Sequence, residues 1–130
     1  MPEGVLSPPP DQPFPAFPEQ EPVMTTATVK FSEIDLMDHL NNASVVEILD
    51  NAGWEALAIR DIAPTNARFT SRDYDIEYVD SPRFGEQLEI QNWFDPIPTP
   101  GKAFTRFQNM LREGKTMVRA YSRWLWENAE

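Results

Sequence analysis

The chain has no cysteine and only one histidine, His39. It can therefore form no disulfide and offers no thiolate nucleophile, and metal sites built on cysteine or on several histidines are excluded. We expect no bound metal and no cofactor. Lys and Arg are also scarce: 11 of them stand against 21 Asp and Glu, which gives a net charge of −10. Such a surface repels nucleic acid and anionic membranes, so we expect neither as a partner.

The sequence also lacks any apolar run of transmembrane length. Residues 1–10 have neither the basic nor the apolar region of a secretion signal. A cytoplasmic location is therefore the default expectation.

The first 22 residues contain eight of the 13 prolines and no Lys or Arg. Proline fixes one backbone torsion and removes an amide donor, so this stretch cannot form a helix or a central strand. We predict an extended tail or linker over residues 1–22, from which Phe14 and Phe17 can still dock on the body. Residues 23–130 are predicted to form a single domain. Its core is modest, and many domains of that size pair to bury more surface.

The remaining residues contain one helical pattern among several strand patterns. Over residues 43–60, apolar side chains cover most of the helix circumference and leave a narrow polar stripe, which indicates a buried helix. Gly53 in its middle costs about 1 kcal/mol relative to Ala and favours close approach of a neighbouring segment. Alternating or β-branched patterns predict strands at residues 25–31, 69–79, 87–94, 103–111 and 116–126.

One strand, a long buried helix and four further strands describe an α+β domain in which an antiparallel sheet wraps around the helix. Residues 112–115 are predicted to form the turn of the last hairpin. Because the sheet keeps an open edge, we expect pairing with another domain of the same kind. The partner would be a second copy, in a homodimer or a tetramer of dimers, or a second domain of the same fold.

Residues 35–42, with the sequence DLMDHLNN, lie between the first strand and the helix. They gather carboxylates, an imidazole and two amides at a helix N-terminus, where unpaired N–H groups and the positive end of the helix dipole point outward. Such a place can hold a developing negative charge with an acid or base beside it. The alternative is that Asp38 or Asn42 only caps the helix and that His39 is a turn residue.

Four short motifs together resemble hotdog-fold thioesterases, of the acyl-ACP thioesterase and 4-hydroxybenzoyl-CoA thioesterase-like group. They are FSEID at 31–35, HLNN at 39–42, YDIEY at 74–78 and, beyond Pro82, FGEQL at 84–88. The resemblance covers residues 25–126 and implies the hotdog fold, a long central helix wrapped by about five antiparallel strands. It also implies an acyl thioester hydrolase that acts on acyl-CoA or acyl-carrier-protein substrates at a dimer interface.

In that family the carboxylate at the place of Asp35 is catalytic, and His39 matches a histidine of the plant-like members. Met37 stands where those members have Asn, and Pro82 lies nearest to the position where some use Cys or Glu. The resemblance therefore leaves Asp35 and His39 as the candidate catalytic pair. Asp35 would activate water or attack as a nucleophile. The carbonyl would be polarised by backbone N–H groups in the region of Asn41, Asn42, Ala43 and Ser44.

Other residues have a structural explanation that competes with a functional one. We expect one of Asn41 and Asn42 to be the helix N-cap. Three tryptophans either line an acyl tunnel or, as we favour, belong to the core or an interface: Trp93, Trp124 and Trp126. Six cations either meet phosphates of coenzyme A or a carrier protein or, as we favour, are ordinary surface charge: Lys102, Arg106, Arg112, Lys115, Arg119 and Arg123.

Two other functions remain open. Hotdog hydratases or dehydratases of the enoyl-CoA type usually show Asp-x-Asn-Pro-x-His, whereas Asp35 and His39 are four residues apart with no Pro between them. This spacing favours the thioesterase. The main alternative is a non-catalytic hotdog module, which binds a ligand or forms the structural half of a two-domain protein. Met37 and Pro82, at positions of family site residues, keep that alternative open.

The lack of helix and strand patterns before residue 23 generates a first prediction. A chain without residues 1–22 should keep its helix and sheet, because the deleted segment holds no regular structure. Far-ultraviolet circular dichroism and thermal unfolding of the full and shortened chains test this. Loss of the helical signal, or of a cooperative transition, would contradict the prediction.

Overall fold

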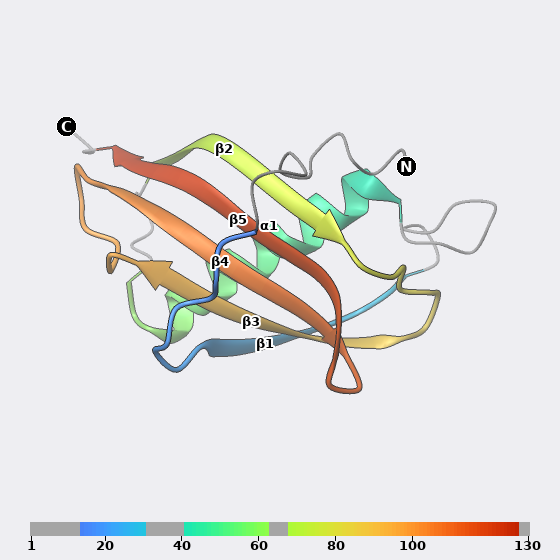
Figure 1. The fold of residues 1–130 in the computed structure, drawn as a ribbon. Coiled ribbons are helices and arrows are strands. Elements are labelled where there is room, and N and C mark those ends of the chain that lie inside the picture. Colours follow the sequence, from blue (N-terminus) through green and yellow to red (C-terminus); the bar gives the residue numbers. More distant parts are fainter. Residues whose placement is uncertain (1–13, 31–40, 63–67, 128–130) are drawn as a thin grey trace.

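The computed structural model describes residues 14–30, 41–62 and 68–127. These residues form β1 (Val23–Thr28), α1 (Asn42–Ile59), β2 (Arg68–Tyr78), β3 (Gln87–Asp95), β4 (Ala103–Arg112) and β5 (Lys115–Glu127). The strands make one antiparallel sheet in the order β1-β3-β4-β5-β2. The helix α1 lies across one face of this sheet (Figure 1), which confirms the α+β architecture. In the described ranges, no helix has the length and apolarity needed to cross a bilayer.

The predicted elements agree with the observed ones to within two residues, except at the end of the first strand. That strand was expected at residues 25–31, but β1 begins at Val23 and ends at Thr28. Its ladder ends there because its partner β3 begins at Gln87, opposite Thr28. The last hairpin turns at Glu113 and Gly114, whose φ angles of 50° and 80° suit a tight two-residue turn.

Two apolar clusters fill the space between α1 and the sheet. The first packs Val45, Ile48 and Leu49 of α1 against inward side chains of the strands, among them Ile76, Leu88, Ile90, Met110 and Val118. The second packs Ala56 and Leu57, nearer the end of α1, against Phe94, Phe104, Trp124 and Trp126. Two of the three singled-out tryptophans are therefore core residues, as the structural alternative predicted.

A row of polar side chains crosses the inner face of the sheet between the two clusters. The Gln108 amide donates to the carbonyl of Leu49 at 2.7 Å and to Asn92 Oδ1 at 2.8 Å. Two residues earlier on β4, Arg106 Nη2 donates to Asp50 Oδ1 at 2.8 Å. Arg106 and Gln108, which are successive inward residues of β4, thus form hydrogen bonds with Asp50 and Leu49, which are adjacent in α1. We call this set the polar row: Thr25, Asn92, Gln108, Arg106, Ser122 and Tyr74.

The burial of Arg106 corrects our interpretation of it as surface charge, because only 1% of the residue is exposed. Its guanidinium donates to the Tyr74 hydroxyl at 2.7 Å as well as to Asp50, and its Cζ lies 4.8 Å from the ring centroid of Trp124. Strand alternation explains the position. Phe104 and Arg106 are two residues apart, and both point inward.

Gly53 lies directly above this guanidinium. A Cβ added to Gly53 would be 2.6 Å from Arg106 Nη1 and 2.8 Å from Arg106 Cδ. The close approach expected at this glycine therefore exists, and the neighbour is a buried side chain.

Replacing Gly53 by Ala should lower the free energy of unfolding, although Ala is favoured in helices by about 1 kcal/mol. Arg106 is tied to Asp50 and Tyr74 and surrounded by rings, so it has no room to yield. Overpacking of this kind typically costs about 1–3 kcal/mol. Urea unfolding measures the change, with Asn51→Ala as the control, because Asn51 is an exposed position of the same helix. If Gly53→Ala proves as stable as the wild type, Arg106 is free to move.

Candidate functional site

The residues Asp35 and His39 lie outside the described part of the chain, but the structure fixes both ends of their segment. At one end, the Val29 N–H donates to the Glu86 carbonyl at 3.0 Å, and the Val29 carbonyl accepts from the Gly85 N–H at 3.0 Å. At the other end, Asn41 begins the helix. Both ends lie at the same end of the molecule, on the right in Figure 1. The predicted catalytic pair thus belongs to the connection between β1 and the start of α1.

Asn41 is the N-cap of α1. Its backbone is extended, with φ −78° and ψ 157°, and its Oδ1 accepts the Ser44 N–H at 2.8 Å. Its carbonyl accepts the first intrahelical hydrogen bond, from Val45 at 3.0 Å. The expectation that one of the two asparagines caps the helix is therefore confirmed, and the alternative in which Asn42 is the cap is wrong.

Capping uses the N–H of Ser44 and does not involve the two amides before it. The N–H groups of Asn42 and Ala43 have no acceptor among the described residues, and both residues are exposed, whereas Ser44 is 8% exposed. The first turn of α1 contains no acidic residue that would neutralise the positive end of the helix dipole. Of the four residues predicted around an oxyanion, the geometry leaves Asn42 and Ala43 as available donors.

Two tyrosines of β2, Tyr74 and Tyr78, face α1 but differ in their hydrogen bonding. The Tyr74 hydroxyl accepts from Arg106 at 2.7 Å and donates to Asp50 Oδ1 at 3.3 Å, and burial raises the pKa of Tyr74 far above its usual range. The Tyr78 hydroxyl is buried but has no hydrogen-bond partner among the described residues. Its ring packs on the first apolar cluster, which contains Val45 near the start of α1, and burial raises its pKa as well.

Tyr78 is therefore a candidate site residue that the sequence analysis missed. A buried hydroxyl without a partner costs about 1–3 kcal/mol, so it is available to a ligand or a water molecule. Its place in the YDIEY motif at 74–78 was the available signal. The strand pattern at 69–79 could not show which tyrosine is paired, because the Tyr74 hydroxyl owes its hydrogen bond to Arg106, which is distant in sequence.

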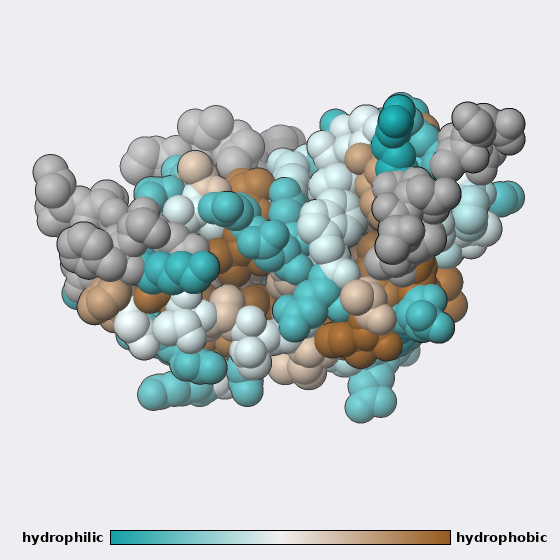
Figure 2. Space-filling model, turned by 180° about the vertical axis from the view of Figure 1, so that it is seen from behind, coloured by the Kyte–Doolittle hydropathy of each residue, from teal (hydrophilic) through white to brown (hydrophobic). Residues whose placement is uncertain are grey.

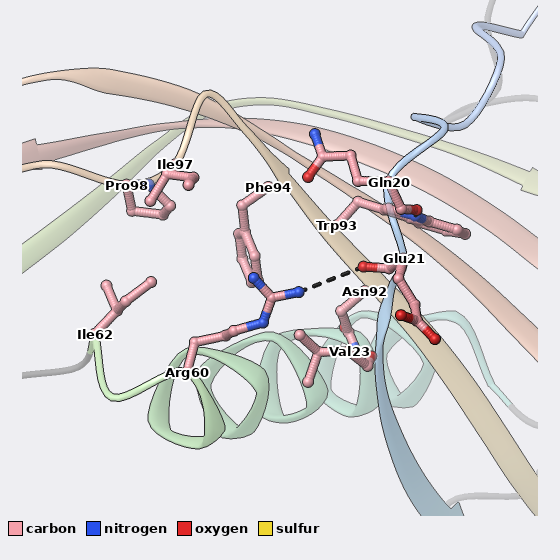
Figure 3. A pocket seen from close by; sticks show the side chains of 10 residues that line it. All are labelled: Gln20, Glu21, Val23, Arg60, Ile62, Asn92, Trp93, Phe94, Ile97 and Pro98. Atoms are coloured by element: carbon pink, nitrogen blue, oxygen red, sulfur yellow. Dashed lines mark hydrogen bonds between the residues drawn. The ribbon is translucent and has the colours of Figure 1, made fainter.

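A pocket lies at the far end of α1 (Figure 3). It is a shallow pocket of about 310 Å³, including its open mouth. Arg60 reaches across it and donates to the Glu21 carbonyl at 3.4 Å, beside the apolar side chains of Phe94 and Ile97. The 18 residues of α1, at about 1.5 Å each, separate this pocket from Asn41. It is not part of the predicted thioester site.

Apolar surface is exposed on the helix side of the molecule, shown in Figure 2. Ile59 is 58% and Ile97 is 64% exposed.

No group of three or more His, Cys, Asp or Glu in the described ranges lies close enough together to hold a metal ion.

Neither a protein-family model nor a curated protein sequence matches the chain. Solved structures do match. A probable thioesterase from Bartonella henselae superimposes with a TM-score of 0.71 at 17% identity, over 84% of this chain and 92% of that one. A 1,4-dihydroxy-2-naphthoyl-CoA thioesterase from Synechocystis gives 0.72 at 10% identity, over 83% of each chain.

A thioesterase from Thermus thermophilus, solved with coenzyme A and zinc, gives a TM-score of 0.70 at 15% identity, over 82% of this chain and 85% of that one. These likenesses show the fold, and they confirm the architecture that the sequence motifs implied.

The cap generates a prediction about Asn41. Asn41→Ala should lower the free energy of unfolding by about 1 kcal/mol, because the Ser44 N–H loses its acceptor. Asn41→Asp should keep the wild-type stability or exceed it, since a carboxylate caps well and interacts favourably with the helix dipole. Urea unfolding of the three proteins tests this. Equal stability of the Ala and Asp variants would show that the cap contributes nothing.

Proposed function

We propose that this hotdog-fold protein hydrolyses acyl thioesters carried on coenzyme A or on an acyl carrier protein. The observation that supports this most is the exposed start of α1, where Asn42 and Ala43 present two N–H groups without an acceptor among the described residues. The motifs at 31–35 and 39–42 place Asp35 and His39 directly before it in sequence. The solved structures named as thioesterases support the same activity.

The reaction needs a nucleophile, a site for the oxyanion and a leaving group. Asp35 takes a proton from water as the water oxygen bonds to the thioester carbon. The carbonyl oxygen becomes an oxyanion that the amides of Asn42 and Ala43 stabilise, each such donor being worth about 2.7–4 kcal/mol in other enzymes. The carbon–sulfur bond then breaks and the thiolate leaves without a strong acid. Alternatively, the Asp35 carboxylate attacks the thioester carbon and expels the thiolate, and water then opens the resulting anhydride to the free acid and the Asp35 carboxylate.

His39 and Tyr78 have supporting roles in this proposal. His39 either bonds the thioester carbonyl or holds the segment that carries Asp35. The unpaired Tyr78 hydroxyl is available to bind the acyl group's carbonyl or the attacking water.

A second copy of the chain would complete the site. The strand β2 forms one edge of the sheet, and its residues from Thr70 to Asp73 are exposed. An unpaired edge of this length is a natural surface for association. We therefore expect a homodimer with the acyl site at its interface, and this assembly is part of the proposal.

Asp35→Asn keeps the shape of the side chain but removes the base, so thioester hydrolysis should fall by about 10²–10⁴-fold. His39→Ala should have a smaller effect if His39 only positions the segment. Release of free thiol from a panel of acyl-CoA and acyl-carrier-protein substrates measures the rates. Asp38→Asn is the matched control, because Asp38 lies in the same segment and has no assigned role.

Three outcomes would revise the proposal. Equal rates for the wild type and Asp35→Asn would remove Asp35 from the mechanism. Binding of thioesters without turnover of any of them would favour the non-catalytic module. Asn41→Asp tests the oxyanion donors separately, because the cap is kept while a negative charge beside Asn42 and Ala43 should lower the rate. An unchanged rate in Asn41→Asp would place the oxyanion elsewhere.

A further inference from the structure

The face of the sheet opposite α1 carries a row of aromatic side chains. Trp93 on β3, Phe107 on β4 and Tyr121 on β5 are direct cross-strand neighbours, and we call them the aromatic row. Their positions alternate with inward residues, so they point away from α1. Outward aromatics of a sheet are normally open to solvent, yet only 7% of Trp93 is exposed.

Residues 14–22, which we call the strap, cover this row. The ring of Phe17 stacks on Trp93 with centroids 4.7 Å apart, and the ring of Phe14 meets Tyr121 edge-on at 5.1 Å. The Trp93 indole N–H donates to the carbonyl of Gln20 at 2.8 Å. Figure 1 shows the strap crossing the sheet face before the chain enters β1.

Charge at one end of the row adds to the contact with Phe14. The guanidinium of Arg119 lies 4.8 Å from the Phe14 ring centroid and is itself paired with Glu77. A cation over a ring face is attracted by the ring quadrupole. Phe14 is thus held by Tyr121 and Arg119, and Phe17 is held by Trp93.

The spacing of the two phenylalanines matches the spacing of the strands. In a polyproline-type chain, residues three apart point the same way and lie about 9.3 Å apart. Neighbouring strands lie about 4.8 Å apart, so β3 and β5, with β4 between them, are separated by about 9.6 Å. Phe14 and Phe17 are three residues apart, with Pro15 between them and Pro18 after them. An extended proline-rich segment therefore reaches Tyr121 and Trp93 at once.

The strap is attached to the body by few contacts. Residues 14–22 belong to no strand. Besides the ring contacts and the indole hydrogen bond, Arg60 donates to the Glu21 carbonyl at a long 3.4 Å. Ordering each residue of an extended segment costs conformational entropy. A short segment held by two side-chain rings, one of them also beside a cation, and by two hydrogen bonds is therefore expected to dock and release rather than to be a permanent part of the core.

We propose that the aromatic row is a binding site for extended proline-rich peptides with two phenylalanines three residues apart. The strap fills this site within its own chain, and the same segment of a second copy fills it when the strap is released. An indole N–H that donates to a peptide carbonyl, beside rings that pack on a proline-rich chain, is a recurrent mode of peptide recognition. Exchange of straps would thereby link copies through the face opposite α1.

The experiment empties the site in the full-length chain and offers the ligand separately. In the Phe14→Ala/Phe17→Ala variant the strap loses both anchors. A fluorescent peptide of residues 14–22, FPAFPEQEP, is titrated against this variant and the wild type, and anisotropy reports binding. Hydroxyl-radical labelling of Trp93, read by mass spectrometry, reports whether the site is uncovered. Glu19→Ala is the matched control, because Glu19 is an exposed strap residue.

The peptide should bind the double variant saturably and the wild type at least about tenfold more weakly, because the docked strap competes within the chain. The Glu19→Ala protein should behave as the wild type. Adding Trp93→Phe to the double variant should weaken binding by about 2- to 10-fold, since one hydrogen bond is lost. A peptide with Ala at both phenylalanine positions should not bind.

Two results would overturn the proposal. The first is that the peptide fails to bind a double variant in which Trp93 is uncovered, or that the Ala-substituted peptide binds this variant as tightly as the original peptide does. The other is Trp93 remaining covered in the double variant, since the two rings would then not be the anchors. If circular dichroism shows that the double variant is unfolded, Phe17→Ala alone is judged by the same criteria.

Discussion

Two inward side chains of β4, Gln108 and Arg106, fix the position of α1 by hydrogen bonds. Apolar contacts are non-directional and would let a helix slide or rotate over the sheet. Gln108 and Arg106, by contrast, hold the carbonyl of Leu49 and the carboxylate of Asp50 at 2.7 and 2.8 Å. If α1 shifted along its axis by one turn, about 5.4 Å, both contacts would break. The shift would also replace Gly53, which leaves space for the Arg106 guanidinium, by a residue whose side chain would collide with it. The rotation and register of the helix, and with them the location of its N-terminus, follow from these contacts.

The Arg106 cluster specifies the structure more than it stabilises it. Burying a guanidinium carries a desolvation penalty that its partners only partly offset. Arg106 Nη2 donates hydrogen bonds to Asp50 and Tyr74. The rings of Trp54, Tyr74 and Trp124 surround the guanidinium. Its Nε and Nη1 have no hydrogen-bond partner among the described residues. Replacing the whole cluster by apolar residues could leave stability unchanged, but the helix would lose the contacts that distinguish one register from the next.

The helix and the strands were predictable because each has a local pattern that burial on one face imposes. What the sequence analysis missed depends on pairing between distant residues. Arg106 was judged by residue type, although Phe104 two positions earlier shares its inward face. Asn41 and Asn42 have the same side chain, so only the backbone geometry identifies Asn41 as the cap and leaves Asn42 and Ala43 as donors. The prolines predicted an extended segment, but the face on which it docks is set by Trp93 and Tyr121, far along the chain. Asp35 and His39 rest on the motif alone.

The strap and the segment that carries Asp35 and His39 join the same edge strand, β1, at its two ends, and side chains of the polar row hold that strand between them. The strap leads into β1 at Val23, and the segment of Asp35 follows β1. Asn92, which is fully buried, donates to the Val23 carbonyl at 2.9 Å and to Thr25 Oγ1 at 3.2 Å, and it is itself held by Gln108. Because these contacts attach the start of β1 to β3 and β4, a displacement of the strap should end at Val23 rather than pass along the strand. Peptide exchange on the outer face is therefore compatible with an undisturbed helix start on the inner one.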